Sequence, residues 1–405
     1  MAHLRFGGAD TVALVERFGS PLYLYDAGRI RSNLRAYRRA FPGADIYYAA
    51  KANTNLAILK LLAKEGAGAD VFSGGELLLA VRAGIPARKL LFNGFSKTDE
   101  ELGLAARKRV AVSCDSLAEL DALDRVARDA GTEVPVAFRV NPAISPKTHP
   151  KIATGLTTSH FGIPHKQVPE AYKEASRRLG VRPAGIHCHI GSQILDTLPF
   201  AEAAHRVMEL VARVNSFVDF DFVDLGGGLG VPYKPGQRAP TPGDLAREVL
   251  PLYDHWCEVI GIGPRLVLEP GRSLVAEAGL LLTRVTAVKG RFVGVDAGFN
   301  LLVRPAMYDA HHEVALANRL GERARGRWTV VGPICETGDI LARDRPLPEP
   351  RRGDLVALFT AGAYGFSMSS QYNSRPRCAE VMVEKGRAKV VRRAERLSDL
   401  LRTQA

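Results

Sequence analysis

Residues 46–55 read IYYAAKANTN, an apolar run that leads into Lys51 and is then broken by Asn53, Thr54 and Asn55. This pattern is typical of a buried strand that ends in a loop, so we expect Lys51 at the carboxyl end of a strand. Burial of the lysine stem lowers the pKa of the amine toward the neutral, nucleophilic form that a Schiff base requires. Taken alone, a lysine just past a strand is more often a solvated surface residue.

Seven further apolar runs end in the same way. Their last residues are Asp70, Asn93, Cys114, Asn141, His189, Gly226 and Glu269. Helical patterns alternate with these runs at residues 56–65, 75–83, 99–108, 116–130, 169–179 and 200–215. Eight parallel βα units in about 250 residues close a TIM barrel, and the spacing therefore predicts one.

The pattern changes after Arg272. Short strand-like runs occur at residues 281–289, 292–295, 328–332, 354–360, 379–384 and 388–392, without long helices between them. These runs predict a second, mostly β domain. Residues 343–352, RDRPLPEPRR, are rich in proline and charge and predict an exposed connector.

Charge and cysteine content narrow the possible partners. A net charge of +12 permits nucleic acid as a partner, but the arginines of residues 29–39 alternate with Ile30, Leu34 and Tyr37 as in an amphipathic helix. No nucleic-acid motif accompanies them, and we expect an anionic small molecule instead. Five scattered cysteines without CxxC spacing predict neither a disulfide framework nor a zinc site. No long apolar segment suggests a signal peptide or a membrane span, so we expect a cytoplasmic protein.

The active site of a TIM barrel lies at the carboxyl ends of its strands. Polar groups gather at those ends here, namely Lys51, Asp70, Arg139 with Asn141, His189 with Ser192, Gly226 to Gly228, and Glu269 to Arg272. GGGLG and EPGR allow the backbone to approach an anion closely and suit a phosphate. A Schiff-base lysine, a phosphate cradle and a carboxylate for a pyridinium nitrogen, for which we choose Glu269, together predict pyridoxal phosphate.

Two other features have competing interpretations. His187 and His189 form an HxH pair, as in metal-dependent amidohydrolases, but no other strand end carries a histidine. We therefore expect no metal, with His189 stacked on the cofactor and His187 deeper in the barrel wall. Cys335, in GPICETGD, has Glu336 and Asp339 close in sequence. A lone cysteine is usually a buried hydrophobe, but this context makes Cys335 a candidate proton donor in its thiol form.

The chain resembles the diaminopimelate decarboxylases, members of the alanine-racemase-like, fold-type III class of pyridoxal phosphate enzymes that also includes ornithine and arginine decarboxylases. The resemblance runs from residue 21 to the end of the chain's β domain. Its motifs are PLYLYD, YYAAKAN, GADVFSGGEL, RVNP with KTHPKIATGL, HCHIGSQI, GGGLGVPY, EPGRSLVAEAG, RPAMYDA, GPICETGD and GAYGFSMSSQYNSRP. Departures from the family pattern are small, such as FNLLVRP before Arg304 and Thr337 in CETGD.

The resemblance implies a barrel of residues 25–269 and a β domain of residues 1–24 and 270–405. It implies catalytic roles for Lys51 and Cys335, with Cys335 entering the active site of the partner in a homodimer. The implied cofactor contacts are Lys51, Asp70, Arg139, His189, Ser192, Gly228, Glu269, Gly271, Arg272 and Tyr364. The implied substrate contacts are Arg272, Arg304, Tyr308, Glu336 and Tyr364.

The activity that the resemblance implies is decarboxylation of meso-2,6-diaminopimelate to L-lysine, the last step of lysine biosynthesis. Arg304 and Glu336 would bind the distal carboxylate and the distal ammonium of this substrate. The alternatives are a related decarboxylase of ornithine, lysine or a siderophore or antibiotic precursor, and a homologue that binds the cofactor without turnover. The presence of Lys51, Glu269 and Cys335 argues against the latter.

Overall fold

The computed structural model describes residues 2–144, 148–149, 152, 154 and 160–404. The chain divides into two compact units. One consists of Asn33–Val231 and Arg238–Ser273, and the other of Met1–Ser32, Pro232–Gln237 and Leu274–Ala405. We call them the barrel unit and the β unit.

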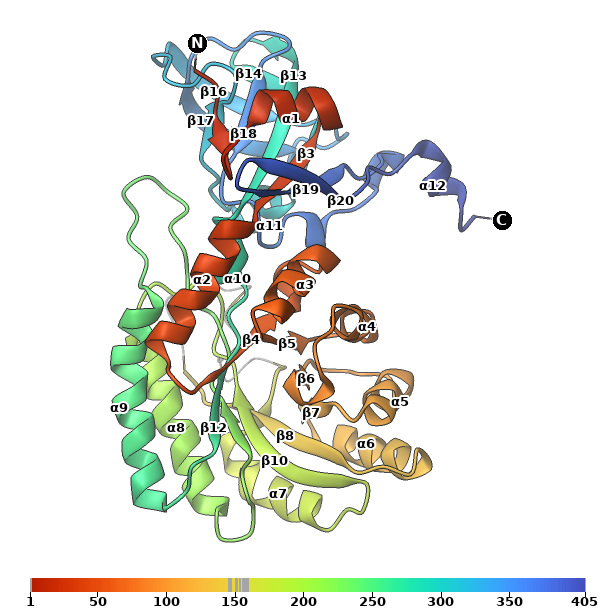
Figure 1. The fold of residues 1–405 in the computed structure, drawn as a ribbon, viewed down its shortest axis with the longest axis vertical. Helices are drawn as coiled ribbons and strands as arrows, with labels where there is room; N and C mark the ends of the chain where they lie inside the picture. The colour runs from red at the N-terminus through yellow and green to blue at the C-terminus, as the bar shows by residue number, and fades with distance from the viewer. Residues whose placement is uncertain (1, 145–147, 150–151, 153, 155–159, 405) are drawn as a thin grey trace. The chain divides into compact units, whose positions relative to one another are not determined.

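In the described part of the barrel unit, eight parallel strands close into a barrel, as predicted (Figure 1). The strands are β4 (Asp45–Ala49), β5 (Gly68–Val71), β6 (Leu90–Phe92), β7 (Ala111–Cys114), β8 (Val134–Asn141), β10 (Val181–Cys188), β11 (Phe222–Asp224) and β12 (Arg265–Leu268). The pairing of β8 with β10 and of β12 with β4 closes the ring. The two-residue strand β9 (Ile163–Pro164) also pairs with β8.

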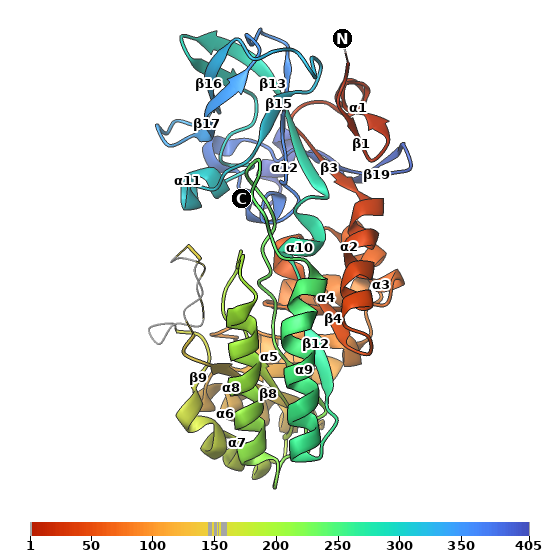
Figure 2. The same cartoon turned by 90° about the vertical axis from the view of Figure 1, so that its left-hand side faces the viewer.

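Helices follow the strands and cover the barrel. They are α2 (Ala27–Ala40), α3 (Leu56–Lys64), α4 (Gly74–Arg82), α5 (Asp99–Lys108), α6 (Leu117–Asp129), α7 (Val168–Ser176), α8 (Leu198–Val214) and α9 (Pro242–Ile260), with single turns η1 (Ala50–Ala52), η2 (Ala87–Lys89) and η4 (His165–Gln167). Figures 1 and 2 show α8 and α9 side by side. Helix α9 was not among the predicted helices because Pro251 lies inside it and interrupts the pattern.

Polar side chains fix where several of these helices begin. Ser73 Oγ accepts a hydrogen bond from the Glu76 backbone N–H at the start of α4, at 3.2 Å. Thr98 and Glu101 form a reciprocal capping box at the start of α5. Such caps satisfy backbone N–H groups that lack a partner in the first turn, and they therefore fix the residue at which each of these helices begins.

One end of the barrel interior is filled by an apolar layer. Six side chains form it, namely Tyr47, Leu91, Ala137, Ala184, Phe222 and Val267. Glycines leave room for its rings, because a Cβ on Gly68 would lie 2.4 Å from the Tyr47 ring and one on Gly185 would lie 2.3 Å from the Phe222 ring. This packing leaves the carboxyl ends of the strands as the polar end of the barrel.

The β unit is mostly strand, as predicted. Its sheet has the order β17-β16-β14-β13-β3-β19-β20, and β18 pairs with both β13 and β15. These strands are β3 (Leu22–Asp26), β13 (Gly279–Lys289), β14 (Phe292–Val295), β15 (Val314–Leu316), β16 (Gly326–Val331), β17 (Ile340–Leu347), β18 (Leu355–Leu358), β19 (Ala379–Glu384) and β20 (Arg387–Arg392). The smaller elements are β1 (Arg5–Phe6), β2 (Ala9–Asp10), α1 (Thr11–Phe18), α10 (Arg272–Val275), α11 (Arg304–Tyr308), η5 (Phe366–Met368), η6 (Tyr372–Ser374) and α12 (Leu397–Leu401).

The prediction of a connector at residues 343–352 was wrong for its first half. Residues 343–347 belong to β17, which pairs antiparallel with β16, and Leu347 is buried. Pro346 is compatible with this strand because β17 lies at the edge of the sheet, where a missing N–H leaves no ladder bond unmade.

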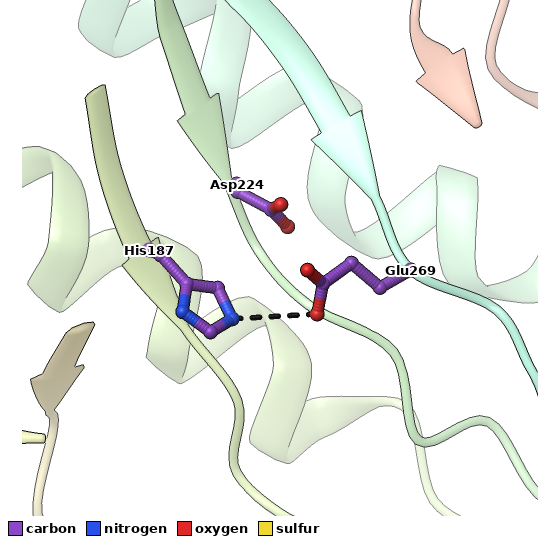
Figure 3. A group of neighbouring side chains, drawn as sticks. All are labelled: His187, Asp224 and Glu269. Atoms are coloured by element: carbon purple, nitrogen blue, oxygen red, sulfur yellow. Dashed lines mark ion pairs between the residues drawn. The ribbon is translucent and has the colours of Figure 1, made fainter. Parts of the chain in front are cut away.

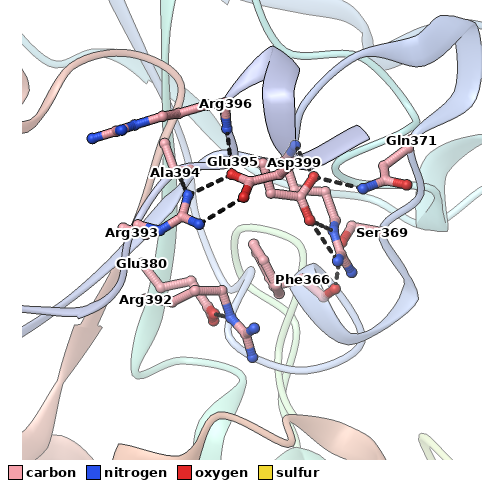
Figure 4. Close-up of polar contacts among 11 residues, drawn as sticks. Phe366, Ser369, Gln371, Glu380, Arg392, Arg393, Ala394, Glu395, Arg396 and Asp399 are labelled. Atoms are coloured by element: carbon pink, nitrogen blue, oxygen red, sulfur yellow. Dashed lines mark hydrogen bonds and ion pairs between the residues drawn. The ribbon is translucent and has the colours of Figure 1, made fainter. Parts of the chain in front are cut away.

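The segment after β20 is tied back to an earlier loop (Figure 4). The carboxylate of Glu395 accepts hydrogen bonds from Gln371 Nε2 at 2.9 Å, from the Arg377 backbone N–H at 2.9 Å and from Arg377 Nε at 2.8 Å. Glu395 therefore holds both ends of residues 371–377.

None of the helices in the described residues combines the length and the apolar character needed to cross a membrane.

Candidate active site

Lys51 lies in η1, directly after β4. Its Nζ is 2.5 Å from Asp70 Oδ2 at the end of β5 and 3.9 Å from the centre of the Phe72 ring. The Lys51 side chain is 28% exposed, whereas Asp70 is fully buried. Burial raises the pKa of Asp70, the charge of Glu269 raises it further, and Lys51 opposes both effects. The amine is thus held by a buried carboxyl group but stays reachable.

Asn93, at the end of β6, joins Asp70 to Glu269. Its Nδ2 donates to Asp70 Oδ1 at 2.7 Å and to Glu269 Oε1 at 2.6 Å. All three side chains are at most 2% exposed. The amide therefore separates two buried carboxyl groups and satisfies one oxygen of each.

Glu269, at the end of β12, faces His187 of β10 and Asp224 of β11 (Figure 3). His187 Nε2 lies 3.3 Å from Glu269 Oε2, close enough for an ion pair although the geometry of a hydrogen bond is not met. Burial alone would raise the pKa of Glu269, but His187 and Lys51 lower it. Burial and the charge of Glu269 raise the pKa of Asp224. The pKa values of the two carboxyl groups therefore shift in opposite directions, and Glu269 is the one that stays ionised.

These three side chains offer ligand atoms within 4.8 Å of one another, so the group could also hold a metal ion. Two of its members have other partners within the barrel. His187 Nδ1 contacts Ser113 Oγ at 3.1 Å, and Asp224 Oδ1 accepts from the Gly226 backbone N–H at 2.7 Å.

The charge of Glu269 also acts on His189 and Arg139. His189 Nδ1 accepts a hydrogen bond from the Gly227 backbone N–H at 3.2 Å, which places the ring proton on Nε2. Burial, Lys51 and Arg139 lower the pKa of His189, so its ring is neutral at pH 7. Arg139 is 3% exposed, and its Nη1 has no hydrogen-bond partner among the described residues. Burial also lowers the pKa of this guanidinium.

The glycine run after β11 passes very close to neighbouring backbone. A Cβ on Gly228 would lie 2.3 Å from the carbonyl oxygen of Gly191, and its φ of +114° is unfavourable for other residues. Ser192 Oγ accepts from Arg272 Nη2 at 3.0 Å. Gly271 packs on β4, where its Cβ would lie 3.0 Å from that of Ala49. Ser192, Gly228, Gly271 and Arg272 thus belong to loops that meet at the polar end of the barrel.

The predicted residues of the β unit form separate groups. Cys335 is exposed, and its Sγ accepts from Asn373 Nδ2 at 3.2 Å. Tyr372 Oη donates to Glu336 Oε1 at 2.8 Å. The sequence analysis assigned no role to Tyr372 or Asn373, although both lie in the motif GAYGFSMSSQYNSRP, because they are almost forty residues from Cys335 in a loop without a regular pattern.

Arg304 is 5% exposed at the start of α11, with Tyr308 at the end of this helix. Its Nη1 donates to His312 Nε2 at 2.8 Å, and its guanidinium lies 4.5 Å from the centre of the Tyr233 ring. Tyr364 has a positive φ of 56° and is partly buried. The roles of these three residues toward a substrate stay predictions.

The barrel side chains fit pyridoxal phosphate. Arg139 Nη1 is a buried donor that has no partner among the described residues, and Glu269 is an ionised carboxylate suited to a protonated ring nitrogen. The φ of +114° at Gly228 and its contact with the Gly191 carbonyl oxygen require a glycine there. Sequence reasoning missed Asn93 and Asp224 as members of this group, although both lie at strand ends.

Comparison with known proteins agrees with this fit. Residues 27–276 match the family described as pyridoxal-dependent decarboxylase, pyridoxal binding domain. The diaminopimelate decarboxylase of Archaeoglobus fulgidus is 51% identical over 401 residues, which cover 98% of this chain and 96% of that protein. The chain belongs to the diaminopimelate decarboxylase family.

Solved structures of this family have the same fold. The Methanocaldococcus jannaschii diaminopimelate decarboxylase in complex with L-lysine has a TM-score of 0.92 and 40% identity, covering 98% of this chain and 94% of that one. The Helicobacter pylori enzyme complexed with L-lysine has a TM-score of 0.91 and 37% identity, covering 97% and 98%. The predicted barrel with an added β domain is therefore confirmed.

Proposed function

We propose that this protein decarboxylates meso-2,6-diaminopimelate to L-lysine, the last step of lysine biosynthesis. The observation that carries the proposal is the 51% identity to a diaminopimelate decarboxylase over nearly the full length of both chains. The group formed by Lys51 and the buried side chains of Asp70, Asn93 and Glu269 supports it, because it supplies a partly exposed amine and an ionised carboxylate at the polar end of a barrel.

Pyridoxal phosphate, when bound, supplies an electron sink for the pair of electrons that remains on the substrate when carbon dioxide leaves. Lys51 would hold the cofactor through its amine, and Asp70 would keep that amine oriented. Glu269 would hold the proton of the ring nitrogen, and the neutral His189 would lie against the ring. We assign the phosphate to Ser192, Gly228, Gly271 and Tyr364. Arg139 and Arg272 complete the cofactor contacts.

For the substrate we propose contacts with Arg272, Arg304, Tyr308, Glu336 and Tyr364. A distal ammonium and a distal carboxylate distinguish diaminopimelate from plain diamine precursors, and Glu336 and Arg304 carry the matching charges. Cys335 would donate the proton that replaces the carboxyl group. These roles agree with the family motifs in which the residues lie.

We further propose a homodimer in which Cys335 of one subunit completes the site of the other, with residues 25–269 as the cofactor domain. The exposure of Cys335 supports this arrangement, since a proton donor must reach the substrate. We also propose a cytoplasmic location, in agreement with five cysteines that are all free.

The test is to incubate the purified protein, supplemented with pyridoxal phosphate, separately with meso-diaminopimelate, lysine and ornithine and to measure carbon dioxide release. We expect release from diaminopimelate and at least about a thousandfold lower kcat/KM for the other two, because each lacks the distal carboxylate. The Lys51→Ala variant is the control for background release. Equal kcat/KM for ornithine or lysine would reject the substrate assignment.

A further inference from the structure

A single side chain holds Cys335 at two points. Asn373 Oδ1 accepts from the Cys335 backbone N–H at 3.1 Å, and Asn373 Nδ2 donates to Cys335 Sγ at 3.2 Å. The orientation of the amide follows from these partners, because a backbone N–H can only donate. The thiol is thus fixed relative to its own backbone by one rigid planar group.

The loop that carries Cys335 is anchored by Asp339. This carboxylate is 3% exposed and accepts from the Phe299 backbone N–H at 2.6 Å and from the Ile334 backbone N–H at 2.7 Å. Asn373 is anchored as well, because Glu395 holds both ends of residues 371–377 (Figure 4). The contact between Cys335 and Asn373 therefore joins two loops that are each fixed independently.

The backbone of Asn373 has a positive φ of 56°, and so has Ser374 at 52°. This left-handed conformation is uncommon outside glycine, and asparagine tolerates it better than most residues. A residue that retains such a conformation while its amide contacts a candidate proton donor suggests a functional constraint.

We propose that Asn373 is a positioning residue for Cys335, orienting the thiol and stabilising the thiolate that remains after proton donation. This inference rests on the proposed role of Cys335. In that step the S–H bond breaks and a C–H bond forms at the carbon that has lost carbon dioxide. The electron pair stays on sulfur, where the Asn373 N–H donates to it, and solvent then restores the thiol proton.

The other groups around the thiol differ from Asn373 in charge or in distance. Glu336 is acidic and adjacent in sequence, and Tyr372 Oη lies 4.0 Å from Sγ. Hydrogen bonding to Glu336 and to Cys335 raises the pKa of Tyr372 to about 12, so this phenol is neutral at pH 7. Arg375 donates to the Pro333 carbonyl at 3.3 Å, and Asp339 is occupied by backbone N–H groups. Among the described residues, Asn373 therefore supplies the closest hydrogen-bond donor to the sulfur.

The test uses two variants and a matched control. Asn373→Asp keeps the shape and the acceptor for the Cys335 N–H but replaces the donor to sulfur by a carboxylate oxygen. Asn373→Gly removes both contacts and suits the positive φ. Ser374→Gly relaxes the neighbouring positive φ without touching the amide and is the control.

The measurement is the rate of iodoacetamide alkylation of Cys335 in the holoenzyme between pH 6 and pH 9.5, followed by mass spectrometry of the peptide that contains it. We expect Asn373→Asp to raise the apparent thiol pKa by about one unit, which slows alkylation near pH 7 about tenfold. Asn373→Gly should shift it in the same direction, and Ser374→Gly should stay within about twofold of wild type. Unchanged alkylation in both Asn373 variants would overturn the proposal.

Turnover separates this proposal from the role of Cys335 itself. If Cys335→Ala retains full kcat, Cys335 is not the proton donor, yet a shifted alkylation profile in the Asn373 variants still demonstrates positioning. If Cys335→Ala lowers kcat while neither Asn373 variant changes the alkylation rate or kcat, the role of Cys335 as proton donor is supported and the positioning role of Asn373 is refuted. Asn373→Gly serves as the deciding variant if Asn373→Asp does not fold.

Discussion

Replacing Asn93 with alanine should destabilise the apoenzyme strongly. The change removes two hydrogen bonds, of 2.7 Å to Asp70 and 2.6 Å to Glu269, from groups that are at most 2% exposed. A hydrogen bond to a charged group contributes about 1.5–3 kcal/mol, and the vacated site leaves two carboxyl oxygens without that donor. We therefore expect a loss of about 3–5 kcal/mol in the free energy of unfolding.

Urea and thermal unfolding measure this loss. A loss of this size lowers Tm by about 6–20 °C in a domain as large as the barrel. The cofactor is left out, since its binding would add stability of its own. Asn55→Ala is the control, because Asn55 is equally buried but only caps α3, accepting from the Ala57 backbone N–H at 2.9 Å. Loss of such a cap costs about 1 kcal/mol.

The effect should depend on pH. Burial already raises the pKa of Asp70, and the hydrogen bond from Asn93 opposes that rise. Its removal raises the folded-state pKa further above the unfolded value, so the added instability is complete above the folded pKa and is lost as pH falls through it. The difference in the free energy of unfolding between wild type and Asn93→Ala should therefore narrow as pH falls through the raised folded-state pKa of Asp70. Two results would refute the charge-assisted role of Asn93. One is a loss in the free energy of unfolding no larger than that of Asn55→Ala, and the other is a loss that stays constant with pH.

Three further predictions concern the active site. Borohydride should fix the cofactor to the peptide that contains Lys51 and leave Lys51→Ala unlabelled; a labelled Lys51→Ala protein would reassign the lysine. Mixing inactive Lys51→Ala with inactive Cys335→Ala should restore about a quarter of wild-type activity, because half of the dimers are then heterodimers and each heterodimer contains one intact site. If the subunits are proven to exchange and no activity returns, the active sites are not shared. Arg304→Met should lower kcat/KM for diaminopimelate about a thousandfold and for lysine far less, since only diaminopimelate has a distal carboxylate that Arg304 could bind. Equal decreases for both substrates would leave Arg304 with only a structural role, through its hydrogen bond to His312.

The barrel was predictable because its strands are buried on both faces and end abruptly in polar residues. Parallel strands of this kind appear as continuous apolar runs, and the residues that end them mark the polar end of the barrel. Lys51, Asp70 and Glu269 were found in this way. In the structure Lys51 contacts Asp70, and Asn93 links Asp70 to Glu269.

The remaining parts depend on contacts that sequence spacing does not encode. Asp224 ends an ordinary apolar strand, and only the fold places it against Glu269. Asn373 meets Cys335 through two loops without periodicity. Strand β17 is a third case. Its proline and charged residues give it the composition of a connector, and only its pairing with β16 identifies it as a strand.

The order in which the chain is synthesised matters for the β unit. Strand β3 lies inside its sheet, antiparallel to β13 and parallel to β19. At translation rates of about 5–20 residues per second, the partner β19, about 350 residues further on, emerges about 20–70 s after β3. The whole barrel is synthesised in between, whereas the apolar stretch Leu22–Tyr25 has no completed sheet to join. An unpaired strand of this kind can pair with other chains, so the nascent protein should need chaperones most at β3, until β19 has emerged.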